Sequence, residues 1–165
     1  MHQMSFKHKL ALALGAGTTT IATLVITYFE GDRHRAYLDG PGVPTICYGH
    51  TRGVALGQTV DHPACERLLR QDLTEALAAV DRRVSVPLPE PRRAALASFV
   101  HNFGEMKFAR STLLRRINAG EGARACSELS RWIYGKDNAS HGRKRIQPGL
   151  VKRRKIERQL CEMQT

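Results

Sequence analysis

The stretch Glu30-Gly-Asp-Arg-His-Arg-Ala-Tyr-Leu-Asp39-Gly-Pro-Gly-Val-Pro-Thr45-Ile-Cys-Tyr-Gly-His50 holds the turn signals and polar side chains from which the fold can be argued. Its Gly-Pro-Gly triplet at 40–42 is a strong turn signal between two short runs that contain β-forming residues. We therefore expect a small hairpin or three-stranded sheet, which begins just after an uncharged segment that ends at Phe29.

From Asp61 onward the apolar residues recur at helical spacing. Asp61 can cap a helix, and Pro63 suits its first turn. The apolar face that follows consists of Cys65, Leu68, Leu69, Leu73, Ala76, Leu77 and Val80. After three prolines, a second helix is expected over Arg92–Phe103.

The C-terminal part predicts shorter helices. We expect them over Ser111–Asn118 and Ala123–Tyr134, then a polar, basic loop up to Gln147, then a last helix over Pro148–Cys161. Its residues Val151, Ile156 and Leu160 are predicted to face inward. The fold class is therefore α+β, with a small N-terminal β lobe packed against a larger helical lobe. A cleft between two such lobes suits an extended substrate.

The composition limits the class of protein and of partner. A chain of 165 residues with 42% hydrophobic residues suits one globular domain. Its formal net charge of +11 predicts an anionic partner such as nucleic acid, a membrane surface or an acidic polymer. The plain alternative is a basic, solvated surface, to which we assign the 136–145 loop and the 152–155 run. Because the basic residues are spread along the chain, no nucleic-acid partner is expected.

The four cysteines, at 47, 65, 126 and 161, form no CxxC pair, and no histidine stands at a zinc-like spacing from them. We therefore expect no structural zinc site, no other metal and no cofactor. An even count fits two disulfides outside the reducing cytoplasm, and the alternative is four buried free thiols.

Residues Leu10–Phe29 contain no charge, and Lys7 and Lys9 precede them. Twenty residues suffice for a membrane-spanning helix, but five threonines and two glycines make this stretch only weakly apolar. Three interpretations compete: a cleaved signal peptide, a buried core helix, and an uncleaved anchor that later leaves the bilayer. We favour the third, and we expect an N-terminal hydrophobic helix.

Two carboxylates and a hydroxyl in the opening stretch suggest a chemistry. Glycoside hydrolysis needs one acid to protonate the leaving oxygen and a second carboxylate to assist water or to stabilise positive charge. Glu30 and Asp39 are candidates for these two roles. The acid needs a partly dry site, which aromatic residues at 28, 29 and 37 could supply. Taken alone, two acids at this spacing carry little weight.

A family resemblance strengthens this hypothesis. The pattern Glu-x8-Asp-x5-Thr, filled by Glu30, Asp39 and Thr45, resembles the catalytic signature of the phage-type lysozymes, glycoside hydrolase family 24. Further matches follow in the family's order: Thr45-Ile-Cys-Tyr-Gly-His-Thr51, the run from Arg92 to Gly104, Ser111-Thr-Leu-Leu-Arg, and Arg131-Trp132. The resemblance spans residues 28 to about 160.

The resemblance implies a role for each catalytic position. Glu30 would be the proton donor, Asp39 the second carboxylate, and Thr45 would help to place the attacking water, which gives inversion at the sugar carbon. The spacing itself cannot show inversion, which depends on the distance between the carboxyl groups.

Further positions match those that face the sugars in the family: His101, Asn102 and Ser111. His101 departs from the apolar residue expected there, and Asn102 near a helix end could only cap or bond locally. We expect His50 to be structural, paired with Asp72. The single tryptophan, at 132, is expected to pack in the core rather than stack on a sugar.

The N-terminal segment resembles that of the signal-anchor-release endolysins of lambdoid-type phages. This implies a releasable anchor over 1–29 and a catalytic domain over 30–165. It also implies residence in the host inner membrane facing the periplasm, then release into the periplasm. The expected activity is hydrolysis of β-1,4 bonds between N-acetylmuramic acid and N-acetylglucosamine in peptidoglycan, with host-cell lysis by a monomer. The alternative is a cationic membrane-disrupting or nucleic-acid-binding protein without glycosidase activity.

Four cysteines allow three disulfide connectivities. From the chain order of the expected elements we prefer Cys47–Cys65 and Cys126–Cys161. The N-terminal segment has no cysteine, so control by exchange between a segment thiol and a body disulfide is excluded.

Overall fold

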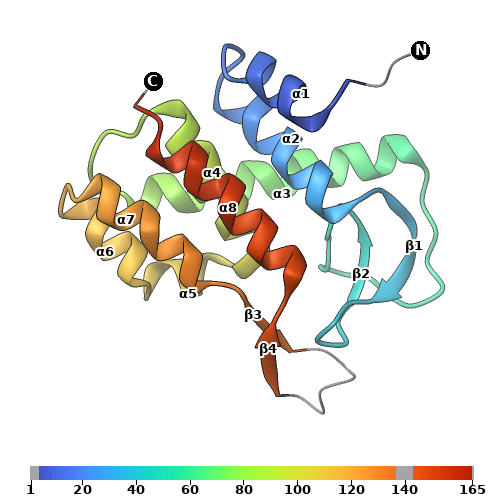
Figure 1. Cartoon of the computed structure of the whole chain (residues 1–165). Helices are drawn as coiled ribbons and strands as arrows, with labels where there is room; N and C mark the ends of the chain where they lie inside the picture. The colour runs from blue at the N-terminus through green and yellow to red at the C-terminus, as the bar shows by residue number, and fades with distance from the viewer. Residues whose placement is uncertain (1–3, 137–142, 165) are drawn as a thin grey trace.

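The structure, a computed structural model, describes residues 4–136 and 143–164. It is α+β and has the two lobes expected, with a small β lobe beside a larger helical lobe (Figure 1). Helix α2 (Thr18–Glu30) leads directly into the β lobe, where strand β1 (Arg33–Leu38) pairs antiparallel with β2 (Pro44–Cys47).

The turn between the strands is closed by the side chain and backbone of Asp39. The Val43 N–H donates to Asp39 Oδ1 over 2.7 Å, and the Gly42 N–H donates to the Asp39 carbonyl over 2.9 Å. Tyr37 then stands opposite Thr45 in the register. The sheet has two strands, and the isolated bridges Arg35↔Thr59 and Ile46↔His50 extend it locally.

Helix α3 (His62–Arg83) begins as its sequence predicts. The Asp61 side chain accepts a hydrogen bond from the Ala64 N–H over 2.9 Å, and proline follows in the first turn. A disulfide between Cys47 and Cys65 ties strand β2 to the first turns of this helix, as preferred from the sequence.

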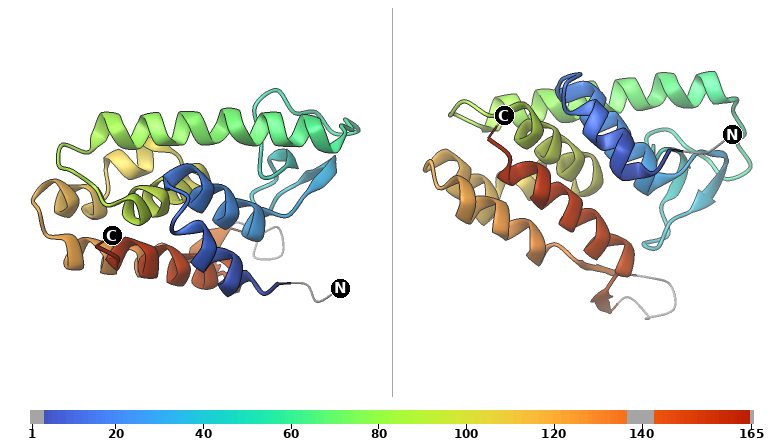
Figure 2. Two further views of the ribbon diagram at one scale, coloured as in Figure 1. Left: turned by 90° about the horizontal axis from the view of Figure 1, so that it is seen from above. Right: turned by 45° about the horizontal axis from the view of Figure 1, so that its top comes forward.

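Helix α4 (Glu90–Phe103) is the centre of the helical lobe. It packs against α2, α3 and α8 (Pro148–Glu162), and Figure 2 shows these helices around it. Its residues 94–100 are all buried, because neighbours cover it on several sides. Helices α2, α3 and α8 are therefore held together through α4.

Shorter helices complete the lobe: α5 (Glu105–Ala109), α6 (Thr112–Asn118), α7 (Gly122–Glu128) and the 3₁₀ helix η1 (Leu129–Arg131). The second disulfide, Cys126–Cys161, ties α7 to α8, again as preferred from the sequence. With loops of this length, each disulfide contributes about 3–4 kcal/mol to the free energy of unfolding.

The N-terminal segment differs from the expectation of one long hydrophobic helix, which is not confirmed. It forms α1 (Phe6–Ala13) and α2, separated by a turn at 14–17 in which Gly17 has φ +89°. Ile21, Ala22, Val25 and Ile26 of α2 are fully buried against the body of the protein. Among the described residues, no helix is both long and apolar enough to cross a membrane. The boundary proposed between residues 29 and 30 falls inside α2.

Three C-terminal expectations were wrong. The helix predicted over 123–134 ends by Arg131, and the chain continues as strand β3 (Tyr134–Lys136). This strand pairs with β4 (Lys144–Ile146), where the sequence analysis expected a loop; residues 137–142 of that loop lie outside the described residues. In α8, Leu160 is buried as predicted, but Val151 is 41% exposed.

Candidate active site

Glu30 is the last residue of α2, at the point where the helical lobe passes into the β lobe. Gly31 follows in a conformation with φ +68°, which favours glycine and turns the chain out of the helix. The Glu30 side chain is 19% exposed, and Arg153 of α8 donates a hydrogen bond from Nη1 to Glu30 Oε1. The fold thus fixes this carboxyl from two distant parts of the chain.

The arginine that holds Glu30 belongs to a buried ionic network. Arg153 Nε lies 3.2 Å from Glu157 Oε1, and Arg154 Nε lies 2.7 Å from Glu157 Oε2. Ser98 of α4 donates to Glu157 Oε1 over 2.7 Å and accepts from Arg153 Nε over 3.3 Å. Two guanidinium groups therefore face the carboxyl groups of Glu30 and Glu157.

This network corrects the sequence analysis, which assigned the 152–155 run to a solvated face. Arg153 and Arg154 are only 3% and 1% exposed at their side chains. A signal was present: positions 153, 154, 157, 160 and 161 share one helical face with the apolar core residues. It was missed because arginine and glutamate are almost never fully buried unless they are paired.

A glycine and a histidine close the site on the other side of Glu30. A Cβ atom added at Gly49 would lie 3.0 Å from Glu30 Oε2 and 3.4 Å from His101 Cε1. His101 Nδ1 lies 3.9 Å from Glu30 Oε1, and the ring is 4% exposed. Burial lowers the pKa of His101, and the nearby Arg153 cation lowers it further, whereas Glu30 opposes them. His101 thus lies behind Glu30 rather than in open solvent.

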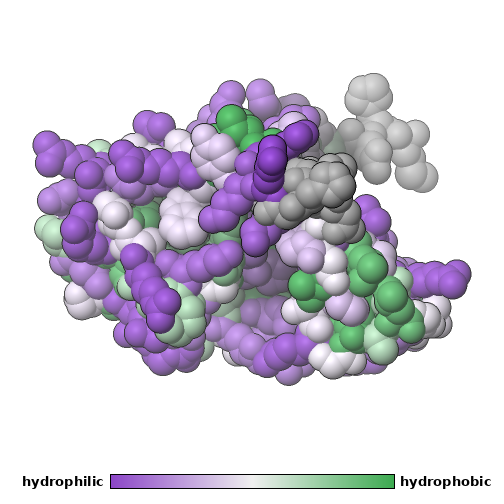
Figure 3. All heavy atoms as spheres, turned by 90° about the horizontal axis from the view of Figure 1, so that it is seen from below, coloured by the Kyte–Doolittle hydropathy of each residue, from purple (hydrophilic) through white to green (hydrophobic). Residues whose placement is uncertain are grey.

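Asp39 and Asn102 line a groove of about 970 Å³ together with Phe103, Trp132, Tyr134 and Leu150. Glu30 lines an adjoining hollow that shares Asn102 and Leu150 with this groove. Figure 3 shows that the surface on this side of the molecule is recessed between its two halves. Arg154 Nη2 donates to Asn102 Oδ1 over 2.8 Å, so the buried network also orients the amide.

The pKa of the Tyr37 phenol is affected by both candidate carboxylates. Burial raises its pKa, Arg33 opposes this increase, and the negative charges of Glu30 and Asp39 raise the pKa further. Tyr37 pairs with Thr45 across the sheet, and Asp39 follows in the turn between the two strands. Thr45 is 3% exposed and donates from Oγ1 to the Val43 carbonyl over 2.9 Å.

Ser111 lies apart from Glu30, Asp39 and Thr45. Its Oγ accepts from the Leu114 N–H and donates to the Phe108 carbonyl, so it caps helix α6. It lines a small pocket with α6 residues, apart from the hollows around Glu30 and Asp39. Its contact with a sugar stays a prediction, as do those of His101 and Asn102.

Two structural expectations are confirmed beside the site. His50 Nδ1 lies 2.8 Å from Asp72 Oδ2, which ties the end of the β lobe to α3. Trp132 packs edge-on against Phe99 and Phe103, with ring centroids 5.1 and 5.3 Å apart, as expected; that it does not stack on a sugar stays a prediction. Trp132 also lines the groove, so one side of the aromatic cluster of Phe99, Phe103 and Trp132 borders the space for substrate.

The fold is similar to that of a muramidase domain and to that of a phage endolysin. The muramidase domain of SpmX from Asticaccaulis excentricus superposes with a TM-score of 0.76, at 32% identity, over 86% of this chain and 95% of that one. The endolysin from Escherichia coli O157:H7 phage FAHEc1 gives 0.75 at 27% identity, over 98% and 95%. Fold and site together define a lysozyme-type glycoside hydrolase.

Sequence comparison gives the family. The phage lysozyme family model matches residues 27–157. The SAR-endolysin of Enterobacteria phage P21 is 38% identical over 164 residues, 95% of each chain, and that of Bacteriophage PS119 is 37% identical over 95% and 94%. The chain therefore belongs to the phage lysozyme family and is a lysozyme, as the motif around Glu30 predicted.

Replacement of Gly49 by alanine tests the close approach to Glu30. We expect Gly49→Ala to displace the carboxyl and to lower kcat/KM by on the order of 100-fold, since a misplacement of about 1 Å has this effect. The matched control is Gly57→Ala, which has a similar φ of +90° but nothing within 4 Å of the new Cβ atom. Equal activity of both variants on purified peptidoglycan would contradict this role of Gly49.

His101 gives a pH dependence of stability. Its folded-state pKa is lowered below 6.5, so between the two pKa values the unfolded chain binds a proton that the folded chain does not. Its stabilising contribution is present above about pH 6.5 and is lost as pH falls, by at most about 1.4 kcal/mol per pH unit. In urea unfolding between about pH 7.5 and 4.5, His101→Phe should therefore lose less stability than the wild type. Parallel curves for the two proteins would exclude this contribution.

Proposed function

We propose that this lysozyme is an endolysin that hydrolyses β-1,4 bonds between N-acetylmuramic acid and N-acetylglucosamine and thereby lyses the host cell. The observation that carries the proposal is the Glu30 carboxyl, which is held by Arg153 and borders a groove. The turn between β1 and β2 presents Asp39 to the same groove. The relatives named SAR-endolysin support it, because they match the chain almost from end to end.

Glu30 would donate a proton to the glycosidic oxygen as the bond to the leaving sugar breaks. Arg153 does two things in this step. It fixes the orientation of the carboxyl, and it stabilises the carboxylate that remains after the proton has left. His101 and Gly49 cover Glu30 from the other side, which limits the water around it.

Asp39 and Thr45 would act on the water and on the sugar carbon. The Asp39 carboxylate stabilises the positive charge that develops on the sugar or accepts a proton from the water. The Thr45 hydroxyl donates its own proton to the Val43 carbonyl, so its oxygen lone pairs can accept a hydrogen bond from the attacking water. Attack by a placed water gives inversion. Asn102, held by Arg154, would bind a sugar at the groove, and the mechanism uses neither a metal nor a cofactor.

The substrate fits the charge of the chain. Its net charge of +11 favours an anionic cell-wall polymer and speeds association with it at low salt. We propose that the enzyme acts as a monomer on peptidoglycan, with residues 30–165 as the catalytic domain.

We further propose that residues 1–29 form a releasable anchor in the host inner membrane and that the enzyme works in the periplasm after release. The physical reason lies in α2. Glu30 is its last residue, so withdrawal of α2 would take the carboxyl away from Arg153 and Gly49. In the docked state the buried face of α2 holds Glu30 in place.

The acid role is tested by release of reducing sugar from purified peptidoglycan. Glu30→Gln should lower the rate by about 10²- to 10⁴-fold, because an amide cannot donate the proton. The control is Glu121→Gln, an exposed glutamate 41% accessible at its side chain, which should retain full activity. A fully lytic Glu30→Gln would point to membrane damage instead.

Release is tested by a change that the docked fold tolerates. Thr19 and Thr20 are exposed in the structure, so replacing both with leucine leaves the packed face intact but makes the segment more apolar. We expect this variant to stay in the membrane fraction and to lyse cells late, whereas the Thr19→Ser/Thr20→Ser control behaves like the wild type. A membrane-retained variant that is as lytic as the released enzyme would contradict control by release.

A further inference from the structure

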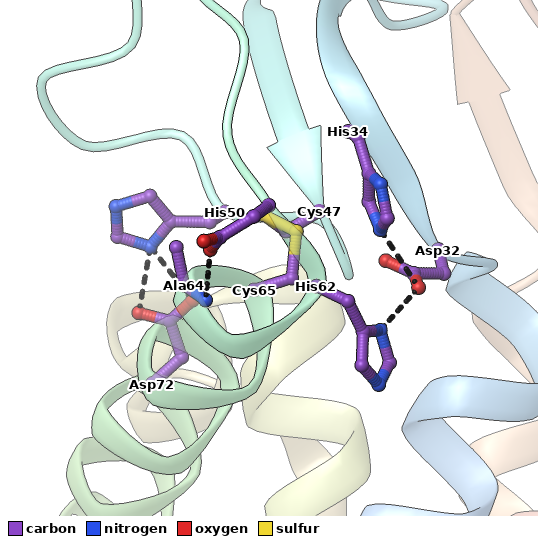
Figure 4. The surroundings of a disulfide bond; sticks show 9 residues. Asp32, His34, Cys47, His50, His62, Ala64, Cys65 and Asp72 are labelled. Carbon is purple, nitrogen blue, oxygen red and sulfur yellow. Dashed lines mark hydrogen bonds and ion pairs between the residues drawn. A yellow bond between two sulfur atoms is a disulfide. The ribbon is translucent and has the colours of Figure 1, made fainter.

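Two histidines converge on one carboxylate beside the disulfide of the β lobe. His34 Nε2 of strand β1 lies 3.0 Å from Asp32 Oδ2, and His62 Nδ1 of helix α3 lies 2.7 Å from the same oxygen. Figure 4 shows the two rings on opposite sides of Asp32, next to Cys65. None of the three residues belongs to the catalytic groove described above.

A fourth residue orients one of the rings. His62 Nε2 lies 3.3 Å from Glu66 Oε1, one helical turn further along α3. Without a bound ion, the other ring nitrogen, Nδ1, donates to Asp32 Oδ2, and it must release this proton before it can bind an ion. A ligating histidine in a metal site commonly has a carboxylate such as that of Glu66 behind it, which fixes the tautomer and makes the ring a stronger ligand.

We propose that Asp32, His34 and His62 form a binding site for one divalent transition-metal ion of the zinc type. Two imidazole nitrogens and one carboxylate oxygen are the ligand set that suits Zn²⁺, Cu²⁺ and Ni²⁺ rather than Mg²⁺ or Ca²⁺. His34 Nε2 and His62 Nδ1 each approach the same oxygen of Asp32, and the ligand atoms of Asp32 and His34 also lie within 4.8 Å of the Cys65 sulfur. Cys65 is oxidised in its disulfide and supplies no thiolate, so water completes the coordination.

The site is accessible, and the backbone that carries it is held in place. The side chains of Asp32, His34 and His62 are 29%, 46% and 52% exposed, so an ion can enter from solvent without any opening of the core. The backbone around them is held by the Cys47–Cys65 disulfide and by the start of α3. Little ordering of the protein is therefore needed when the ion binds.

Spacings from the cysteines predicted no metal site, because they do not include the histidines at 34 and 62. His34 and His62 are far apart in the chain, and only the folded structure brings both of them to Asp32. A bound ion would join the segment directly after Glu30 to α3. It would therefore stabilise the folded state by mass action, whether or not the proposed function of the enzyme is correct.

The test uses the purified full-length chain with both disulfides formed, titrated with ZnCl₂ in a buffer that does not bind zinc. We expect one Zn²⁺ per chain in calorimetry. At a free zinc concentration about 100 times the dissociation constant, Tm should rise by roughly 5–10 °C. Absence of saturable binding or of any rise in Tm would overturn the proposal.

Variants locate the ion. His34→Asn combined with His62→Asn should abolish both the binding and the rise in Tm, while the activity without added zinc stays unchanged. The matched control, His8→Asn, removes an exposed histidine of α1 and should leave the zinc response intact. Zinc binding that survives the double substitution would place the ion elsewhere and overturn the assignment.

Glu66→Gln separates the orienting carboxylate from the ligands. We expect it to weaken zinc binding by about 10-fold or more, since loss of a partner behind a ligating histidine typically costs 10- to 100-fold in affinity. An unchanged affinity in this variant would refute the role of Glu66.

Discussion

The ionic contact between Arg153 and Glu30 is the interaction on which the active site depends. It joins the end of an N-terminal helix to a C-terminal helix, and it holds a carboxyl at the border between the two lobes. An arginine buried to this degree needs more than one partner, because an unpaired buried charge costs about 3–5 kcal/mol. Glu157 and Ser98 supply the others, so the site and the core of the helical lobe are stabilised together.

The same contact makes docking of α2 a condition for catalysis. Glu30 is the last residue of α2, and no linker separates it from the apolar face of this helix. Its carboxyl therefore reaches the site only when α2 is docked. When Ile21, Val25 and Ile26 are buried, the carboxyl reaches Arg153. A segment with many threonines and two glycines suits such a role, since it is apolar enough to pack in a core and only weakly suited to a bilayer.

Much of the fold could be predicted from local patterns. The cap at Asp61, the prolines before the central helix and the Gly-Pro-Gly turn each determine a boundary through the backbone of a few residues. The Glu30, Asp39 and Thr45 positions could be predicted from a family signature, and their separate roles remain proposals. By contrast, the strand pair after Trp132 was missed, because two three-residue strands give too short a pattern to recognise.

The sequence by itself determined the first hairpin, the long helices from Asp61 onward, the family and the identity of the candidate acid, since these depend on residue types at fixed short spacings. Only the tertiary structure decided that Arg153, Arg154 and Glu157 lie inside, because burial of a charge depends on which partners the packing brings to it. Packing also decided that the uncharged segment bends at Gly17 and covers the core, and that His34 and His62 meet at Asp32. These contacts join residues far apart in the chain, and no local pattern encodes them.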